Sequence, residues 1–513
     1  MKYPNPSLIQ QKPMADLSDK VVTGSNPLTG MDYPDPDIIR VGDTYYMIST
    51  TMHFFPGAVI LKSHDLIRWE ICTYLYETLE HTPGEILEDE QTAYGHGMWA
   101  ASLRYHNGRF YAVFIAHEWP ETFLFTADRI EGPWKKSYIE GIYHDSSLLF
   151  DDDGRVYIVY GNRNIRLTEL REDLSGPKEG GLDRIIVRDV PESPLGYEGS
   201  HLYKINGKYI LLMIHSLREK WFRAEACFTA DSPDGEWTGG DVLVSDLDGL
   251  NSGVAQGGIV DTPDGRWFAI LFQDHGPVGR IPVLVPVTWN ESGFPVFGPV
   301  TREIANTCTR PDWTPRPLWA DDDFTSPALK DVWQFNHEPR EGCRETGNGA
   351  YVIRTDRISR TVEHARNTLT QRTVLPGCTA EVTADAAGIR SGDVAGLCLL
   401  IGSYGLIGIT RDGDGYALVM KARKPGEKEE REYARIPWTH REARLRAVVR
   451  FAGLKGDVQF EYLDGAAWKP LGPVHPMVFA LDHFTGCRFG LYLYATEETG
   501  GSAAFRRFTY RAE

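Results

Sequence analysis

Five copies of a short hairpin pattern constrain the fold of this chain more than any other feature of its sequence. Each copy has an apolar strand, a polar turn with glycine and an aromatic-rich strand; the copies are residues 37–49, 102–114, 147–160, 201–213 and 258–271. A glycine in the turn supplies the positive φ angle that a tight hairpin needs. The five turn glycines are Gly42, Gly108, Gly154, Gly207 and Gly265. They recur at intervals typical of propeller repeats, so the sequence predicts a propeller of five blades.

The rest of the chain has the same β character. Alternating apolar runs bounded by Gly, Pro, Asn and Asp continue to the end, and no long helical periodicity interrupts them. A chain of 513 residues is also too long for a single hydrophobic core. A proline-rich passage over residues 310–324 ends the repeats, and the predicted strands behind it are longer. We therefore expect an all-β protein with a propeller over residues 1–315 and a β-sandwich over residues 320–513.

Charge and cysteine content limit the partners that this chain can have. The formal net charge is −17, whereas binding to nucleic acid or to an anionic membrane needs a basic patch, which the sequence lacks. The seven cysteines are scattered and never in CxxC spacing, so we expect reduced thiols rather than disulfides or a zinc site. We see neither the apolar core of a signal peptide nor an apolar run of about 18 residues, and we expect a cytoplasmic location.

Acidic residues precede three of the predicted innermost strands at nearly the same place. Asp35 and Asp145 lie two residues before the first and third strands, and Glu198 lies three residues before the fourth. Trp99 and Gln256 hold the corresponding places in the second and fifth repeats. Because the innermost strands of a propeller line its axis, these side chains should converge at one mouth of the central channel.

Three facing carboxylates can share the tasks of glycoside hydrolysis. Like charges in a desolvated site raise one another's pKa, so one acid can stay protonated beside an ionised one. The reaction uses the protonated acid for the leaving oxygen and the other carboxylate as base or nucleophile. A single aspartate near a strand is more often a turn cap, as residues 151–153 illustrate. The register shared by three acids favours a site.

At these residues the chain resembles glycoside hydrolase family 43, five-bladed propeller enzymes that act on the side chains and ends of xylan and arabinan. The segments that carry the resemblance are PDPDIIRVGDTYYMIS, GMWAASLRYHNGRFY, HDSSLLFDDDGRVYIVYG, YEGSHLYKINGKYIL and FQDHGPVGRIPVLVPVTW. The chain after residue 320 resembles the concanavalin-like β-sandwich of the β-xylosidase and arabinofuranosidase branch, in which a loop of the sandwich helps to close the pocket. The resemblance implies an inverting reaction with Asp35 as general base and Glu198 as general acid. It implies that Asp145 tunes the pKa of the acid and orients it.

Further residues match the family less specifically. The resemblance implies that Phe54 and Trp99 form apolar walls under the sugar, that Gln256 lines the funnel and that Arg280 contacts sugar hydroxyls. It implies that His275 holds a cation or a water on the axis. An ordinary core or salt-bridge role remains the alternative for these residues. The family implies no cofactor for catalysis, while a Ca²⁺ ion on the axis and a homo-oligomeric state stay open.

The function expected on these grounds is an exo-acting glycosidase that releases β-D-xylose from the non-reducing ends of xylo-oligosaccharides. The alternative is an α-L-arabinofuranosidase, alone or combined with xylosidase activity, because the chain has HFFPG (His53 to Gly57) where many xylosidases carry a tryptophan before FPG. An alternative of another class is a non-catalytic propeller that binds glycans. Loss of any of the three acids would favour that alternative, and all three are present. Substrate length, and with it exo or endo action, stays open.

Overall fold

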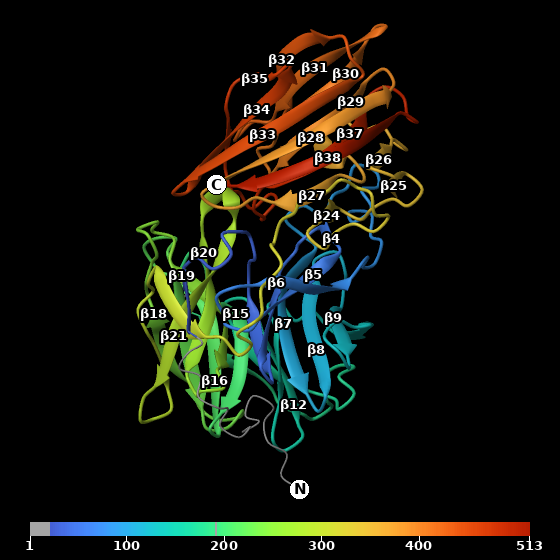
Figure 1. Ribbon diagram of the computed structural model, residues 1–513. Coiled ribbons are helices and arrows are strands. Elements are labelled where there is room, and N and C mark those ends of the chain that lie inside the picture. Colours follow the sequence, from blue (N-terminus) through green and yellow to red (C-terminus); the bar gives the residue numbers. More distant parts are fainter. Residues whose placement is uncertain (1–20, 190–191) are drawn as a thin grey trace.

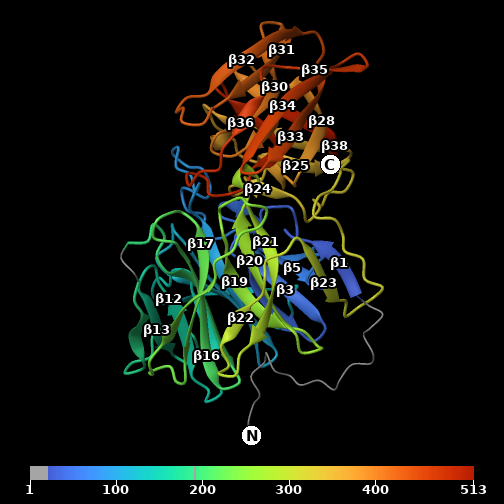
Figure 2. The same cartoon turned by 90° about the vertical axis from the view of Figure 1, so that its left-hand side faces the viewer.

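The computed structural model describes residues 21–189 and 192–513 and confirms the predicted architecture. Five four-stranded sheets form a propeller, and two larger sheets form a sandwich that sits on one end of it (Figure 1, Figure 2). The helices of these two ranges are short 3-10 turns, η2 (Gly276–Val278) and η3 (Val362–His364). No helix in the described part of the chain is long and apolar enough to cross a membrane.

The five blades follow one another along the chain, and the first strand of each blade lies innermost. Blade 1 contains β2 (Asp37–Val41), β3 (Thr44–Ser49), β5 (Gly57–Ser63) and β6 (Glu70–Tyr76). Blade 2 contains β7 (Met98–His106), β8 (Arg109–Ala116), β9 (Thr122–Ala127) and β10 (Lys135–Ile139). Blade 3 contains β11 (Ser147–Phe150), β12 (Val156–Tyr160), β13 (Ile165–Leu170) and β14 (Asp183–Val187). Blade 4 contains β15 (Glu198–Ile205), β16 (Lys208–Ser216), β17 (Arg223–Ala230) and β18 (Thr238–Leu243). Blade 5 contains β19 (Val254–Asp261), β20 (Trp267–Asp274), β21 (Arg280–Trp289) and β22 (Pro295–Phe297).

The innermost strands form a closed ring around the axis. Strand β2 contacts β7, β7 contacts β11, β11 contacts β15, β15 contacts β19, and β19 returns to β2. The chain closes the ring a second time outside the blades, where β1 (Val21–Ser25) pairs with β23 (Glu303–Thr307). The Asn26 side chain reinforces this closure, since its amide donates hydrogen bonds to the carbonyl oxygens of Leu284 and Thr301. Segments from both ends of the propeller sequence are thereby tied together.

The hairpin turns explain why the five sequence copies look alike. All five turn glycines have positive φ angles, from 64° at Gly42 to 88° at Gly154. In blades 2 and 4 the preceding asparagine is left-handed as well, with φ of 50° at Asn107 and 52° at Asn206. Two successive left-handed residues are the requirement of a type I′ turn, whose twist matches that of the paired strands. The repeat is therefore set by backbone conformation.

The sandwich packs two antiparallel sheets face to face. One sheet has the order β32 (Arg431–Trp438), β31 (Gly415–Ala422), β30 (Gly405–Asp412), β29 (Asp393–Leu400), β37 (Arg488–Ala495), β27 (Leu369–Arg372), β24 (Gln334–Asn336) and β4 (Phe54–Phe55). The other has the order β25 (Arg344–Gly347), β26 (Ala350–Arg354), β38 (Ser502–Ala512), β28 (Gly377–Gly388), β33 (Glu442–Ala452), β34 (Lys455–Asp464) and β35 (Ala467–Pro470). Strand β36 (His475–Met477) also pairs with β34. The propeller segment β4 is thus the edge strand of a sandwich sheet, which joins the two domains.

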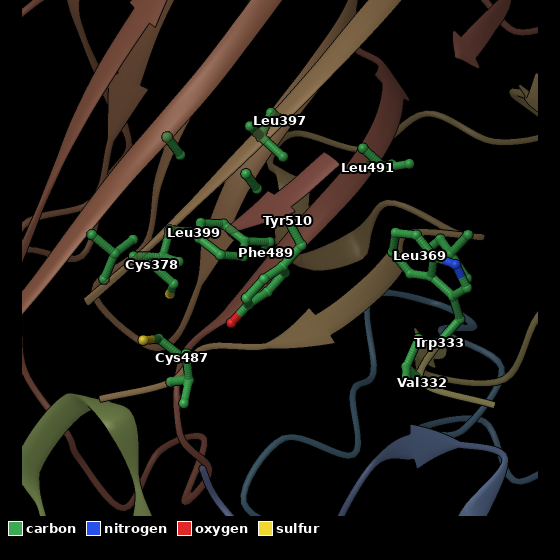
Figure 3. Close-up of a cluster of buried hydrophobic side chains, with 14 of the residues drawn as sticks. Val332, Trp333, Leu369, Cys378, Leu397, Leu399, Cys487, Phe489, Leu491 and Tyr510 are labelled. Carbon is green, nitrogen blue, oxygen red and sulfur yellow. The ribbon is translucent and has the colours of Figure 1, made fainter. Parts of the chain in front are cut away.

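A continuous hydrophobic core runs from the sandwich into the propeller. Leu397 and Phe489 lie between the two sheets and are fully buried, with Tyr510 beside them (Figure 3). Burial of a side chain of this size stabilises a fold by roughly 1.5–3 kcal/mol. The same cluster includes Tyr33 and Met31, which precede blade 1. All seven cysteines are free thiols, as predicted.

Candidate active site

A residue with left-handed backbone stands at the start of every blade, next to the axis. It lies two residues before each of the five sequence copies, and in blades 2, 4 and 5 it coincides with a bulge in the pairing of the innermost strand. The five residues and their φ angles are Asp35 (52°), Ala100 (35°), Asp145 (48°), Gly199 (64°) and Gln256 (59°). Left-handed backbone costs a residue with a side chain about 1–2 kcal/mol, which the surrounding fold must supply. All five line one small cavity of about 10 Å³ on the axis, which has room for about one water.

Asp35 is buried beside this cavity and forms an ion pair with a cation from blade 5. The Arg280 guanidinium donates a hydrogen bond of 2.8 Å to Oδ1 of Asp35, and both side chains are more than nine-tenths buried. A buried ion pair with good geometry is costly to break, since the partner left behind keeps its charge without compensation. Arg280 therefore holds the Asp35 carboxylate in one position.

Asp145 and Glu198 share a second charged cluster, in which a histidine lies between them. Nε2 of His144 is 3.6 Å from Oδ2 of Asp145 and 3.8 Å from Oε2 of Glu198. Burial, followed by the negative charges of Glu198 and Asp35, raises the pKa of Asp145 to about 7, although His144 acts in the opposite direction. Burial disfavours charge on His144 too, but the two carboxylates outweigh it and raise the pKa of His144 to about 9. The Asn162 amide also donates a hydrogen bond of 2.6 Å to Oε2 of Glu198.

A charged plug blocks the axis on the far side of the cavity. Asp37 is fully buried and accepts a hydrogen bond of 2.6 Å from Arg104, and Nδ1 of His201 lies 3.0 Å from its other oxygen. Burial works against the charge of Asp37, but Arg104 and His201 hold its pKa well below the usual range. Arg104 also donates a hydrogen bond of 2.5 Å to the hydroxyl of Ser147 in blade 3. Residues of blades 1 to 4 contribute to this plug or its partners, so the plug lies across the axis. The acids are then accessible from the opposite face of the propeller.

A loop of the sandwich covers part of that face. Phe484 has a left-handed φ of 56°, and the centroid of its ring lies 4.2 Å from the Arg280 guanidinium carbon. The same ring is 5.5 Å from Trp99 of blade 2, measured between centroids. Trp99 in turn contacts His117 at 4.1 Å and lies 6.0 Å from His144. The loop thus spans from blade 5 to blade 2 above Asp35, which agrees with the expectation that a sandwich loop helps to close the pocket.

The structure brings most of the predicted site residues together. Asp35, Asp145 and Gln256 line the axial cavity, and Arg280 contacts Asp35 directly. Glu198 is joined to the cavity through Asp145, whose Oδ2 accepts a hydrogen bond of 3.2 Å from the backbone N–H of Gly199. Gln256 is nearly buried, and its own N–H donates to Glu225 at 2.7 Å.

The structure contradicts the expectation that Phe54 forms a wall of the sugar pocket. It lies in β4, pairs with Asn336 of the sandwich and is 1% exposed, so no sugar can reach its ring in this structure. Its ring lies 3.4 Å from the guanidinium carbon of Arg488. The neighbouring His53 is also buried, and its ring packs against Tyr94, with His337 on another side. Both residues belong to the interface between the two domains, because the FF segment adds a strand to the sandwich sheet.

His275 does not belong to a cluster of three metal-ligating side chains in the described part of the chain. Among residues 21–189 and 192–513, one group of three His, Asp or Glu side chains has donor atoms within 4.8 Å of one another, and it consists of His144, Asp145 and Glu198. Ca²⁺ takes six to eight oxygen ligands, and a protonated His144 would repel a cation. His275 is buried with Asp248 among its charged neighbours, and burial lowers its pKa to about 4. The group of His144, Asp145 and Glu198 therefore does not suit Ca²⁺.

Three residues of the site were not found by sequence reasoning. His144 directly precedes Asp145, and this adjacent pair was a signal that the repeat alignment passed over. Asn162 follows the third repeat and has no counterpart in the other blades that would single it out. Phe484 comes from the sandwich, and only the three-dimensional arrangement places it beside Arg280.

Comparisons with known proteins agree with this geometry. The family model "Glycosyl hydrolases family 43" matches residues 24–295, and the model "Beta xylosidase C-terminal Concanavalin A-like domain" matches residues 321–511. The chain is 27% identical to a beta-xylosidase of Formosa agariphila, with 94% of this chain and 90% of that protein covered. It is 26% identical to the non-reducing end alpha-L-arabinofuranosidase BoGH43B of Bacteroides ovatus, with 80% of each covered. A solved structure described as a bifunctional GH43-CE of Bacteroides eggerthii is 38% identical with a TM-score of 0.89, over 96% of this chain and 64% of that chain.

Proposed function

The chain belongs to glycosyl hydrolase family 43 and is a glycoside hydrolase, and from this premise we propose an inverting exo-glycosidase that releases β-D-xylose from the non-reducing ends of xylo-oligosaccharides. The observation that carries the proposal is the closure of the site. Beneath the acids the plug of Asp37, Arg104 and His201 blocks the axis, and above them Phe484 covers Arg280. A site that is closed below and partly covered above suits the terminal sugar of a chain rather than an internal one.

In the proposed reaction Asp35 is the general base. Arg280 fixes its carboxylate, so that the free oxygen can take a proton from a water molecule. The water oxygen forms a bond to the anomeric carbon while the bond from that carbon to the leaving oxygen breaks. Because the water attacks the face opposite the leaving group, the anomeric configuration inverts and no covalent sugar–enzyme intermediate forms.

Glu198 is the proposed general acid, which gives its proton to the leaving oxygen. Asn162 orients this carboxyl through the hydrogen bond of 2.6 Å, and His144 lies close enough to stabilise the carboxylate that remains after proton transfer. Asp145 lies against the same histidine as Glu198, and burial together with the charges of Glu198 and Asp35 raises the pKa of Asp145. The proposed roles therefore follow from where each charge lies.

α-L-Arabinofuranosidase activity is the second candidate, alone or in the same pocket. Two observations favour it: BoGH43B bears that name, and the chain has Phe54 before FPG, where many xylosidases carry tryptophan. Phe54 and the adjacent His53 lie in the domain interface, and the His53 ring is 6.2 Å from His483, the neighbour of Phe484, so a different residue before FPG can alter the pocket through that loop. The catalytic carboxylates would be the same for both sugars.

The test is to measure kcat/KM on 4-nitrophenyl β-D-xylopyranoside and on 4-nitrophenyl α-L-arabinofuranoside, and to identify the first sugar anomer released by proton NMR. We expect preference for the xyloside and release of α-xylose. A preference for the arabinofuranoside would move the assignment to the second candidate. Initial release of β-xylose would refute the inverting mechanism, and failure to hydrolyse any pentoside would refute the proposed substrate class.

A further inference from the structure

The sandwich leaves one side of the propeller face open. Its contacts fall on blade 1 through His53, on blade 2 through Trp99 and on blade 5 through Arg280. No backbone hydrogen bond within residues 21–189 and 192–513 joins the sandwich to the strands of blades 3 and 4. Those are the blades whose loops carry Asp145 and Glu198. A leaving group that receives its proton from Glu198 can therefore depart over blades 3 and 4.

Exposed apolar side chains occur along this open side. Ile142 in the loop before Asp145 is 59% exposed, and Trp221 in the loop between β16 and β17 is 47% exposed. Trp221 is the one aromatic residue among the large exposed apolar side chains of the described chain. A half-exposed indole keeps apolar surface in contact with water, which is unfavourable in free energy unless a ligand covers that surface. Flat aromatic faces commonly contact sugars in binding sites.

A stack of alternating rings and guanidinium groups holds Trp221 in place. The Arg223 guanidinium carbon lies 5.6 Å from the Trp221 ring and 5.1 Å from the ring of Phe272. Phe272 in turn lies 5.4 Å from Arg280, which binds Asp35. Arg223 is buried, and its charge is satisfied by Asp274 through a hydrogen bond of 2.6 Å. One face of the indole is therefore supported from below, and the neutralised support favours an uncharged ligand on the other face.

The pairing within blade 4 gives the distance from Arg223, which supports Trp221, to the acid. Glu198 pairs with Ile214, and Arg223 lies on the next strand outward, paired with Ser216. Two strand spacings of about 4.8 Å and two residues of about 3.3 Å rise separate the Cα atoms of Arg223 and Glu198 by roughly 12 Å. A short oligosaccharide bound with its scissile oxygen at Glu198 can span that distance.

We propose that Trp221 is the platform on which the leaving-group saccharide stacks, and that it selects neutral oligosaccharides over substrates with a small leaving group. The proposal rests on the function proposed above, because it takes Glu198 as the acid beside the scissile bond. Ile142 borders the same path from blade 3. Trp221 is a specificity-determining residue in this scheme and takes no part in the transfer of protons.

The kinetic test compares Trp221→Ala and Trp221→Phe with wild type on xylotriose and on β-D-xylosyl fluoride, whose leaving group is too small to reach the platform. We expect Trp221→Ala to raise KM for xylotriose about tenfold, the factor that corresponds to 1.4 kcal/mol of binding. Its kcat for xylotriose, and both constants for the fluoride, should stay within about twofold of wild type, and Trp221→Phe should recover most of the loss. Trp468→Ala is the matched control, because Trp468 also stacks on an arginine, Arg446 at 4.4 Å, but lies in the sandwich.

An equal effect on both substrates, or an unchanged KM for xylotriose, would overturn the proposal. A second measurement does not depend on turnover. In the Glu198→Gln protein, the indole N–H signal assigned to Trp221 by its absence in the Trp221→Ala variant should shift when xylotriose is added. If wild type hydrolyses neither substrate, the proposed xylosidase function fails, and the indole signal decides the role of Trp221 separately: a shift supports it and a static signal refutes it.

Discussion

Replacing Asp145 with asparagine should make the protein more stable at neutral pH while it removes activity. The pKa of Asp145 is raised from 3.8 to about 7 in the folded protein, mainly by burial. A tenfold change in an acid constant corresponds to about 1.4 kcal/mol, so ionising this carboxyl in the folded state costs up to about 4 kcal/mol above pH 7. The substitution also deprives His144 of a partner at 3.6 Å, which offsets part of the gain. We expect a net increase in the free energy of unfolding of about 2 kcal/mol near pH 7.5.

The pH dependence of the gain in stability shows whether the ionisation of the buried Asp145 carboxyl is its cause. Below pH 3.8 the carboxyl is protonated in both the folded and the unfolded chain, so it contributes no penalty there. The penalty grows as the pH rises from 3.8 to about 7, so the advantage of Asp145→Asn should grow over the same range. Urea unfolding followed by tryptophan fluorescence, at about pH 4.5 and about pH 7.5, measures the difference. Asp231→Asn is the control, because the Asp231 side chain is 92% exposed. A variant less stable than wild type at pH 7.5, or a gain that does not change with pH, would refute the reasoning.

Three further perturbations test other parts of the site and the domain interface. Arg280→Met removes the ion-pair partner of Asp35, and we expect kcat/KM to fall at least about 100-fold, which corresponds to roughly 3 kcal/mol, with an unchanged circular dichroism spectrum. Phe484→Ala uncovers Arg280 and should raise KM about tenfold with a small change in kcat, and a KM equal to that of wild type would show that the loop does not close the pocket. Burial lowers the pKa of His337 well below 6.5, so a histidine that must stay neutral in the folded state costs stability as the pH falls below 6.5. His337→Gln should flatten the acid side of the stability curve, measured by urea unfolding between about pH 4.5 and 7, and a curve parallel to that of wild type would contradict this cause.

Much of the fold could be predicted because its turns repeat. The five hairpin glycines need left-handed backbone, and that need appears in the sequence as glycine at the same place in each copy. The strand β4 could not be predicted as part of the sandwich, since its pairing with β24 depends on residues far away in the chain. The two phenylalanines of β4 read equally well as a pocket wall or as a buried strand. Burial against the sandwich decides between these two interpretations.

The site was predictable to the extent that its residues share a register. Asp35, Asp145 and Gln256 occupy equivalent left-handed positions, and equivalence in a repeat is visible in one sequence. His144 and Asn162 have no counterparts in the other repeats. Both lie within a few ångströms of Glu198, and their positions along the chain do not predict these contacts. Tertiary contacts therefore supply what the repeat leaves out, namely the partners that tune and orient each acid.

The measurement that tests the central claim most directly is the leaving-group dependence of Glu198→Ala. Wild type and variant are compared on xylobiose, whose leaving sugar needs a proton, and on an aryl xyloside with a leaving group acidic enough to need little assistance. If Glu198 is the general acid, the variant loses at least about 100-fold more kcat/KM on xylobiose than on the aryl xyloside. An equal loss on both substrates would contradict that role, and activity equal to that of wild type on both would show that the carboxylates at the propeller mouth are not the catalytic groups.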